Sequence, residues 1–145
     1  MSIWKGSISL EDLNMRFENT LVQNLGIEFT EIGDAHLGAT LPLDHRTVQP
    51  AGILHGGASL ALAETLGSVA GFVCIDREKQ YCVGIEINAN HIRPVCSGPV
   101  HGVAKPIHIG RKTHVWEIAI SDQHCKLVCV SRITLAILNK EEKIC

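Results

Sequence analysis

The feature that most constrains the fold is a long stretch of chain with almost no charge, QPAGILHGGASLALAETLGSVAG, which runs from Gln49 to Gly71. No Lys, Arg or Asp lies between Arg46 and Asp76, and one acidic residue, Glu64, stands among small and aliphatic residues. We expect a helix here. A helix that is apolar over most of its surface must be covered by other elements, so the chain is expected to fold around it.

Alternating apolar and polar residues predict strands on both sides of this helix. The segment IEFTEIGDAHLGATLPL indicates two strands joined at Gly33–Asp34, a hairpin signal. Because the connections are short, we expect an α+β fold in which the long central helix is wrapped by a curved antiparallel sheet. Four further strands are expected in YCVGIEINANHIRP, PVHGVAKPIHIG, KTHVWEIAIS and KLVCVSRITLAIL.

Two of these segments carry more detailed predictions. Near the N-terminus, apolar residues at positions 10, 13, 17 and 21 predict one helix that Ser9 caps and Gly26 ends. In the first strand after the central helix, strict alternation predicts one shared face for Val83, Ile85, Ile87, Ala89 and His91.

Composition limits the class of protein. The 145 residues, 46% of them hydrophobic, are expected to form one domain spanning 1–145. A net charge of −2 without a long basic run gives no reason to expect nucleic-acid binding. The segment MSIWKGSISLEDL lacks the apolar core of a signal peptide, and no uncharged segment is long enough to cross a membrane, so we expect a cytoplasmic protein.

The cysteines and histidines do not have the spacing of metal ligands. No CxxC or HExxH motif is present, so a metal is not expected. In a reducing compartment, cysteines within apolar runs are expected to be buried free thiols. The six cysteines stand at positions 74, 82, 96, 125, 129 and 145.

The central helix carries two candidate chemical features. Glu64 and Ser68 are four residues apart and hence on one helix face, where they could hold a water or form a carboxylate nucleophile with a water-positioning partner. A solvated surface glutamate is the alternative, although such a face would normally carry several charges. Gly56 and Gly57 open the helix with N–H groups that suit an anion or a developing oxyanion, or they only allow close packing.

The segments QPAGILHGGASLALAETLGSVAG and VGIEINANHIRPV resemble the hotdog-fold acyl-CoA thioesterases that act on aromatic acyl groups. The resemblance is to the branch with the dihydroxynaphthoyl-CoA hydrolase of menaquinone synthesis and the proofreading thioesterase of siderophore synthesis. It extends over nearly the whole chain. The framework Gln-x6-Gly-x7-Glu-x3-Ser/Thr carries it, here as Gln49, Gly56, Glu64 and Ser68.

The resemblance implies a role for each residue of this framework. Glu64 would attack the thioester carbonyl or activate a water. The Gly56 N–H would polarise the carbonyl oxygen, while Gln49 and His55 orient the thioester. Ser68 would hold the hydrolytic water or Glu64 itself.

The resemblance also implies a binding site for coenzyme A. It puts His91, Ile92 and Arg93 beside the thiol arm, whereas His91 by its position alone is more typical of a core histidine. The lip that takes the pantetheine and nucleotide would contain Gly84 and the turn made by His108, Ile109, Gly110, Arg111, Lys112 and Thr113. Arg111 and Lys112 suit phosphates, although solvated turn residues are the alternative.

Helix geometry predicts that one chain cannot form the whole site. Gly56 and Glu64 are eight residues apart, so they lie ~12 Å apart along the helix axis, and both must reach one carbonyl. Two antiparallel copies of the helix could supply both groups. The resemblance likewise implies a homodimer, and often a dimer of dimers, with no metal or redox cofactor, because CoA is part of the substrate.

The expected activity is hydrolysis of aromatic or medium-length acyl-CoA thioesters, and the sequence leaves the acyl group open. A hotdog dehydratase or hydratase is one alternative, although its motif has a longer separation between His and Glu. A non-catalytic acyl-CoA binding module is another. Such a module would need no carboxylate at position 64, and it would usually carry a DNA-binding domain for which we see no room.

Overall fold

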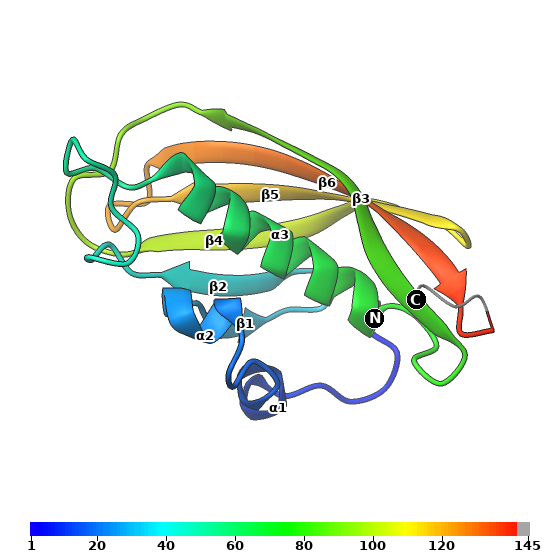
Figure 1. Cartoon of the computed structure of the whole chain (residues 1–145). Coiled ribbons are helices and arrows are strands. Elements are labelled where there is room, and N and C mark those ends of the chain that lie inside the picture. Colours follow the sequence, from blue (N-terminus) through cyan, green and yellow to red (C-terminus); the bar gives the residue numbers. More distant parts are fainter. Residues whose placement is uncertain (142–145) are drawn as a thin grey trace.

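A single antiparallel sheet and one long helix organise the computed structural model, which describes residues 1–141 (Figure 1). The six strands are hydrogen-bonded in the order β1-β2-β4-β5-β6-β3, and the long helix α3 lies across one face of the curved sheet. This confirms the predicted α+β architecture. The elements are α1 (Leu10–Met15), α2 (Leu21–Leu25), β1 (Glu28–Ile32), β2 (Leu37–Leu41), α3 (Gly56–Val73), β3 (Gln80–His91), β4 (Val100–Ile109), β5 (Thr113–Ser121) and β6 (Leu127–Asn139).

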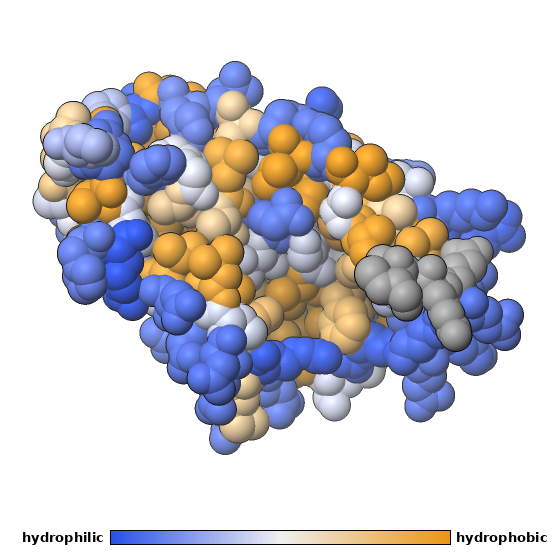
Figure 2. Space-filling model, viewed as in Figure 1, coloured by the Kyte–Doolittle hydropathy of each residue, from blue (hydrophilic) through white to orange (hydrophobic). Residues whose placement is uncertain are grey.

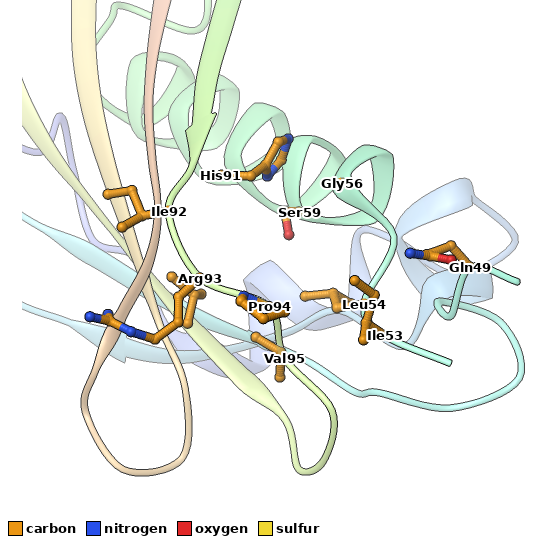
Figure 3. Close-up of a pocket in the computed structure, with 11 residues that line it drawn as sticks. Gln49, Ile53, Leu54, Gly56, Ser59, His91, Ile92, Arg93, Pro94 and Val95 are labelled. Carbon is orange, nitrogen blue, oxygen red and sulfur yellow. The ribbon is translucent and has the colours of Figure 1, made fainter. Parts of the chain in front are cut away.

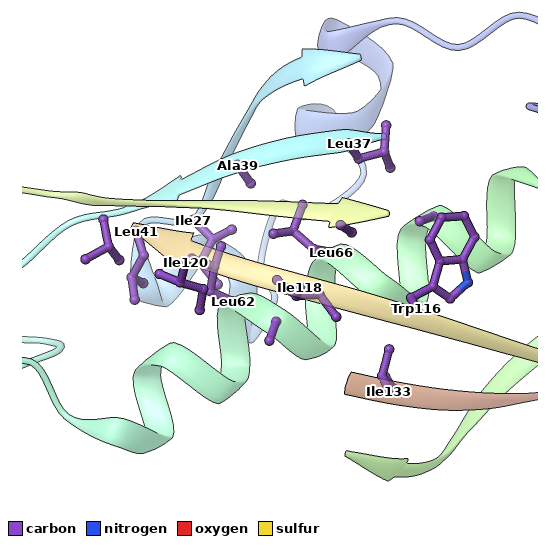
Figure 4. Close-up of a cluster of buried hydrophobic side chains, with 14 of the residues drawn as sticks. Ile27, Leu37, Ala39, Leu41, Leu62, Leu66, Trp116, Ile118, Ile120 and Ile133 are labelled. Atoms are coloured by element: carbon purple, nitrogen blue, oxygen red, sulfur yellow. The ribbon is translucent and has the colours of Figure 1, made fainter. Parts of the chain in front are cut away.

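The hydrophobic core lies between α3 and the sheet (Figure 4). Two glycines let the helix lie close to the strands. A Cβ on Gly67 would come within 2.3 Å of a methyl of Ile133, and a Cβ on Gly71 within 2.3 Å of a methyl of Leu135. Within the described chain, α3 is also the one helix long and apolar enough to cross a membrane, and half of it is buried in the fold. Its apolarity thus belongs to a core helix. Fully buried partners include Leu62, Leu66, Trp116, Ile118, Ile120 and Ile133.

The prediction of one N-terminal helix is wrong, because two short helices replace it. Ser9 caps α1 as predicted, and Gly26 ends α2 with a φ of 72°. Between them Asn19 takes a φ of 61°, which no helix interior allows. The side chain of Asn14 accepts from the Phe29 N–H and donates to the Phe29 carbonyl, which fixes α1 against the outer edge of β1. The apolar spacing continues through the break and therefore does not reveal it.

The predicted shared face of β3 is also wrong, because a β-bulge interrupts the strand. The register with β6 shifts between Gly84 and Glu86, and Ile85 is 64% exposed. Before the bulge, Cys82 and Gly84 face α3, and after it Ile87 and Ala89 pack on the core. A bulge adds one residue and so reverses the alternation. Val83 and Ile85 therefore do not share the inner face with Ile87, Ala89 and His91.

The cysteine prediction holds only in part. Cys74 and Cys129 are buried and free, whereas Cys96 and Cys125 are exposed because they lie in connections between strands. Burial raises the pKa of Cys74 to about 12 and that of the half-buried Cys82 to about 11, so both remain neutral thiols at pH 7. Cys145 lies outside the described residues.

Candidate active site

The start of α3 offers one free backbone donor. His55 is the N-cap: its Nδ1 accepts from the Gly57 N–H at 2.8 Å, and its carbonyl oxygen accepts from the N–H groups of Ala58 and Ser59. The N–H of Gly56 has no partner among the described residues. Contrary to expectation, the Gly57 N–H is therefore not free for a ligand, and Gly56 alone carries this role.

The capping bond of His55 also fixes the proton position in the neutral imidazole. Because Nδ1 accepts a hydrogen bond, the ring hydrogen of the neutral form sits on Nε2. The side chain is exposed, so Nε2–H can donate to a group outside this chain. His55 thus closes the helix end with one nitrogen and presents a donor with the other.

A cavity of about 280 Å³ lies beside this helix end (Figure 3). The Oε1 of Gln49 accepts from the Ala51 N–H, which leaves the amide NH₂ as a donor on the cavity side. The His91 ring lies against Gly56, where a Cβ would come within 2.8 Å of its Nε2. Only glycine fits there without displacing the ring. The lining consists of Gln49, Ile53, Leu54, Gly56, Ser59, His91, Ile92, Arg93, Pro94, Val95 and Val128.

The structure thus brings the predicted residues Gln49, Gly56, His91, Ile92 and Arg93 together. His91 is exposed, so it is not a core histidine. The guanidinium of Arg93 donates to the Leu127 carbonyl, which holds it at the rim beside the β5–β6 turn.

Ser59 is a lining residue that the sequence interpretation missed. It is buried, with 4% of its surface exposed. The side chain projects from α3 toward the cavity (Figure 3). The signal that could have revealed it is its position in the first turn of the central helix, close to Gly56, on the side that packs against the sheet.

Glu64 lies in the middle of α3, half-buried, on the side of the helix that β3 borders. Its Oε1 accepts from the Ser68 hydroxyl at 3.3 Å, so these two side chains do share one helix face as predicted. A Cβ on Gly84 would come within 2.8 Å of the same Oε1. Glu64 is therefore not a fully solvated surface glutamate, and Gly84 provides the space for its carboxylate.

The predicted turn from His108 to Thr113 lies apart from both the cavity at the start of α3 and the Glu64–Ser68 pair. Its end of the sheet packs near the second half of α3, where Gly71 contacts His114. Arg111 and Lys112 line a surface cavity of about 370 Å³ together with Gln80 and residues 137–139. The predicted site residues thus occupy three places along α3: its start, its middle and its far end. One chain does not bring them together.

Within residues 1–141, no group of three or more His, Cys, Asp and Glu side chains could hold a metal ion. The donors described above are backbone N–H, amide, imidazole and hydroxyl groups, and the acceptor is one carboxylate. Such a set can polarise a carbonyl oxygen and deliver a nucleophile to its carbon.

Comparison with known proteins agrees with this chemistry. Residues 51–129 match the thioesterase superfamily. The chain is 54% identical to the 1,4-dihydroxy-2-naphthoyl-CoA hydrolase of Escherichia coli, over 94% of this chain and 99% of that protein. It is 52% identical to the proofreading thioesterase EntH of Cronobacter turicensis, over 94% of this chain and 98% of that protein.

Solved structures give the same result. A crystal structure of a thioesterase from Haemophilus influenzae is 50% identical, covers 99% of both chains and superposes with a TM-score of 0.94. The crystal structure of a mutant thioesterase from Pseudomonas aeruginosa also superposes with a TM-score of 0.94. It is 47% identical and covers 95% of this chain and 99% of that one. The chain therefore belongs to the thioesterase superfamily and has the hotdog fold that its sequence predicted.

Proposed function

We propose that this protein hydrolyses acyl-CoA thioesters to the free acid and CoA, with Glu64 as the catalytic carboxylate. The observation that carries the assignment is the half-buried carboxylate of Glu64, which Ser68 contacts and for which Gly84 leaves space. Aromatic acyl groups such as 1,4-dihydroxy-2-naphthoyl, as in menaquinone synthesis, are the first candidates because the relative from Escherichia coli is named for that substrate. Medium-chain acyl groups are the second. We place the reaction in the cytoplasm.

Variants of a related protein support the choice of residues. Two similar structures from Staphylococcus aureus, both 38% identical to this chain, carry replacements of a glutamine and of a glutamate. These two positions are separated by the same number of residues as Gln49 and Glu64.

The chemistry can follow two balanced routes. In the first, Glu64 attacks the thioester carbon to form a mixed anhydride and release the CoA thiolate, after which water hydrolyses the anhydride. In the second, Glu64 takes a proton from a water that attacks the same carbon, the C–S bond breaks, and the departing CoA thiolate takes up that proton. In both routes the carbonyl oxygen gains negative charge, which the free Gly56 N–H at the helix N-terminus stabilises. The donors of Gln49 and His55 hold the thioester, and Ser68 positions the water or the carboxylate.

Two copies of the chain would assemble the site. Gly56 and Glu64 lie at the start and the middle of one helix, ~12 Å apart along its axis. Strand β3 is the last strand of its sheet and carries Gly84 beside Glu64, so a partner that pairs with this edge comes next to the carboxylate. A two-fold pair would then place the Gly56 N–H of one copy near Glu64 of the other, at two equivalent sites. We further propose that two such dimers form a tetramer.

The test of the catalytic role is Glu64→Gln, which preserves size and removes the base. Hydrolysis of 1,4-dihydroxy-2-naphthoyl-CoA, followed by CoA thiol release, should slow by ~10²–10⁴-fold or more in kcat. Glu117→Gln removes an exposed carboxylate from β5 and should leave kcat unchanged. A Glu64→Gln enzyme that keeps more than about a tenth of wild-type kcat contradicts the assignment. A single turnover in oxygen-18 water tests for the anhydride: label enters Glu64 only if water attacks the Glu64 carboxyl carbon of that intermediate, whereas label found in the product acid alone fits both routes.

A further inference from the structure

A second cavity, of about 240 Å³, begins beside the proposed catalytic carboxylate. Ser68, which contacts Glu64, lines it, and so does Phe72 one helical turn further on. The N-terminal segment forms the opposite wall. Figure 2 shows hydrophobic side chains gathered around the middle of α3 on this face. The lining consists of Leu13, Arg16, Phe17, Ser68, Val69, Phe72 and Cys82.

Arg16 is the one charged residue in this lining. Its Cζ lies 4.4 Å from the centroid of the Phe72 ring, a cation–π contact. Among the described residues it forms no ion pair and no side-chain hydrogen bond, so its N–H groups are open to a ligand. Arg77, by contrast, lies 5.9 Å from the same ring, donates to the Lys5 carbonyl and does not line the cavity.

The dimensions fit the far end of an acyl group. Along the helix axis, Ser68 lies ~6 Å and Phe72 ~12 Å beyond Glu64. An aryl group attached to a carbonyl at Glu64 would extend past Ser68 toward Val69 and Phe72, both of which line the cavity. A substituent on its remote carbon would then point toward Arg16.

We propose that this cavity receives the acyl group and that Arg16 selects acyl groups with a hydroxyl or carboxylate oxygen on the end remote from the thioester. This proposal rests on the proposed function. The physical reason is that a guanidinium offers several fixed donors to such oxygens, whereas an unsubstituted ring or a methyl group gives it no acceptor.

The test uses three CoA esters of nearly the same shape: 4-methylbenzoyl-CoA, 4-hydroxybenzoyl-CoA and 4-carboxybenzoyl-CoA. For each enzyme, kcat/KM on the hydroxy and carboxy esters is divided by kcat/KM on the methyl ester. In Arg16→Met, which keeps a long side chain over Phe72, both ratios should fall about 3- to 10-fold. Arg16→Lys should retain part of the preference, most clearly for the carboxylate.

Arg77→Met is the matched control, because it removes the other cation near Phe72 but leaves the cavity lining intact. Its ratios should equal those of the wild type. Unchanged ratios in Arg16→Met, or an equal fall in Arg77→Met, overturn the proposal. Hydrolysis of the methyl ester, which has no group for Arg16, tests the proposed function separately: if wild type and Glu64→Gln do not differ on it, the function itself fails and the proposal fails with it.

Discussion

His114 is a buried titratable side chain that the proposed reaction does not use. It is 2% exposed, its Nδ1 has no hydrogen-bond partner in the described chain, and its ring packs against Gly71 of α3 and beside Trp116. Burial lowers its pKa below the ordinary value of 6.5, because the charged form loses its hydration. Below pH 6.5 the unfolded chain therefore binds more protons at this residue than the folded chain does.

We predict that the free energy of unfolding decreases as the pH falls from 6.5 toward the lower pKa of folded His114, by up to about 1.4 kcal/mol per pH unit. Well above pH 6.5, where His114 is neutral in both the folded and the unfolded chain, this residue contributes no pH dependence. Urea unfolding of wild type and His114→Leu at pH 7.5 and 5.5 measures the difference. The leucine variant should lose part of the decrease, and His124→Gln, which changes an exposed turn histidine, should not. Equal pH dependence in all three proteins contradicts the prediction.

Some of the candidate site could be predicted residue by residue, and some could not. Glu64 stands out in the sequence because it is the one acidic residue in a long uncharged stretch, and Ser68 follows from the helical period. The capping of Gly57 by His55 depends on a side-chain rotamer, which no spacing encodes. Arg16 lies far from Phe72 in sequence, and their contact depends on how the N-terminal segment folds back.

At the scale of elements, every predicted strand is present because alternation and turn residues agree. Two local departures escaped prediction for different reasons. The break at Asn19 leaves the apolar spacing intact, so periodicity continues through it. The bulge in β3 depends on the pairing with β6, which a single strand does not reveal. Both departures shape the site. The break at Asn19 follows the helix that brings Arg16 to the second cavity, and the bulge in β3 lets Gly84 face Glu64.

The hairpin between β4 and β5 carries the cations Arg111 and Lys112 on its turn, beside a surface cavity. We propose that they bind CoA phosphates. Replacing both with Ala should raise KM for CoA esters and weaken its dependence on salt, with kcat little changed, because the contacts form in the ground state as well as in the transition state.

The measurement for this hairpin is steady-state kinetics at two salt concentrations on a CoA ester and on the matching pantetheine ester, which lacks the nucleotide. Lys126→Ala, in the β5–β6 turn, is the control and should behave as wild type. An equal loss of kcat/KM on both esters would show that the hairpin does not act through the phosphates.

At the scale of the whole molecule, the shared site predicts complementation between inactive variants. Glu64→Ala and His55→Ala each damage every site of their own homodimer. After subunit exchange, about half of the dimers contain both variants, and each of these has one intact and one doubly altered site. Thiol release should therefore return to about a quarter of the wild-type rate.

The controls for this experiment are the two variants carried separately through the same exchange protocol, and both should remain inactive. A mixture that remains inactive, although mass spectrometry of the native assembly detects mixed dimers, contradicts the shared site.

The contact between Asn14 and Phe29 has a consequence for how many copies can join through their sheets. At the outer edge of β1, the Asn14 side chain already occupies the N–H and the carbonyl of Phe29, and α1 covers that edge. Strand β3 lies at the opposite edge of the sheet, as the last strand in the hydrogen-bonded order. A chain with two open edges could add further copies without limit, as fibrils do. With the β1 edge blocked, the pairing proposed through β3 would end after a single addition, and its product would be a closed pair with a covered edge at each end.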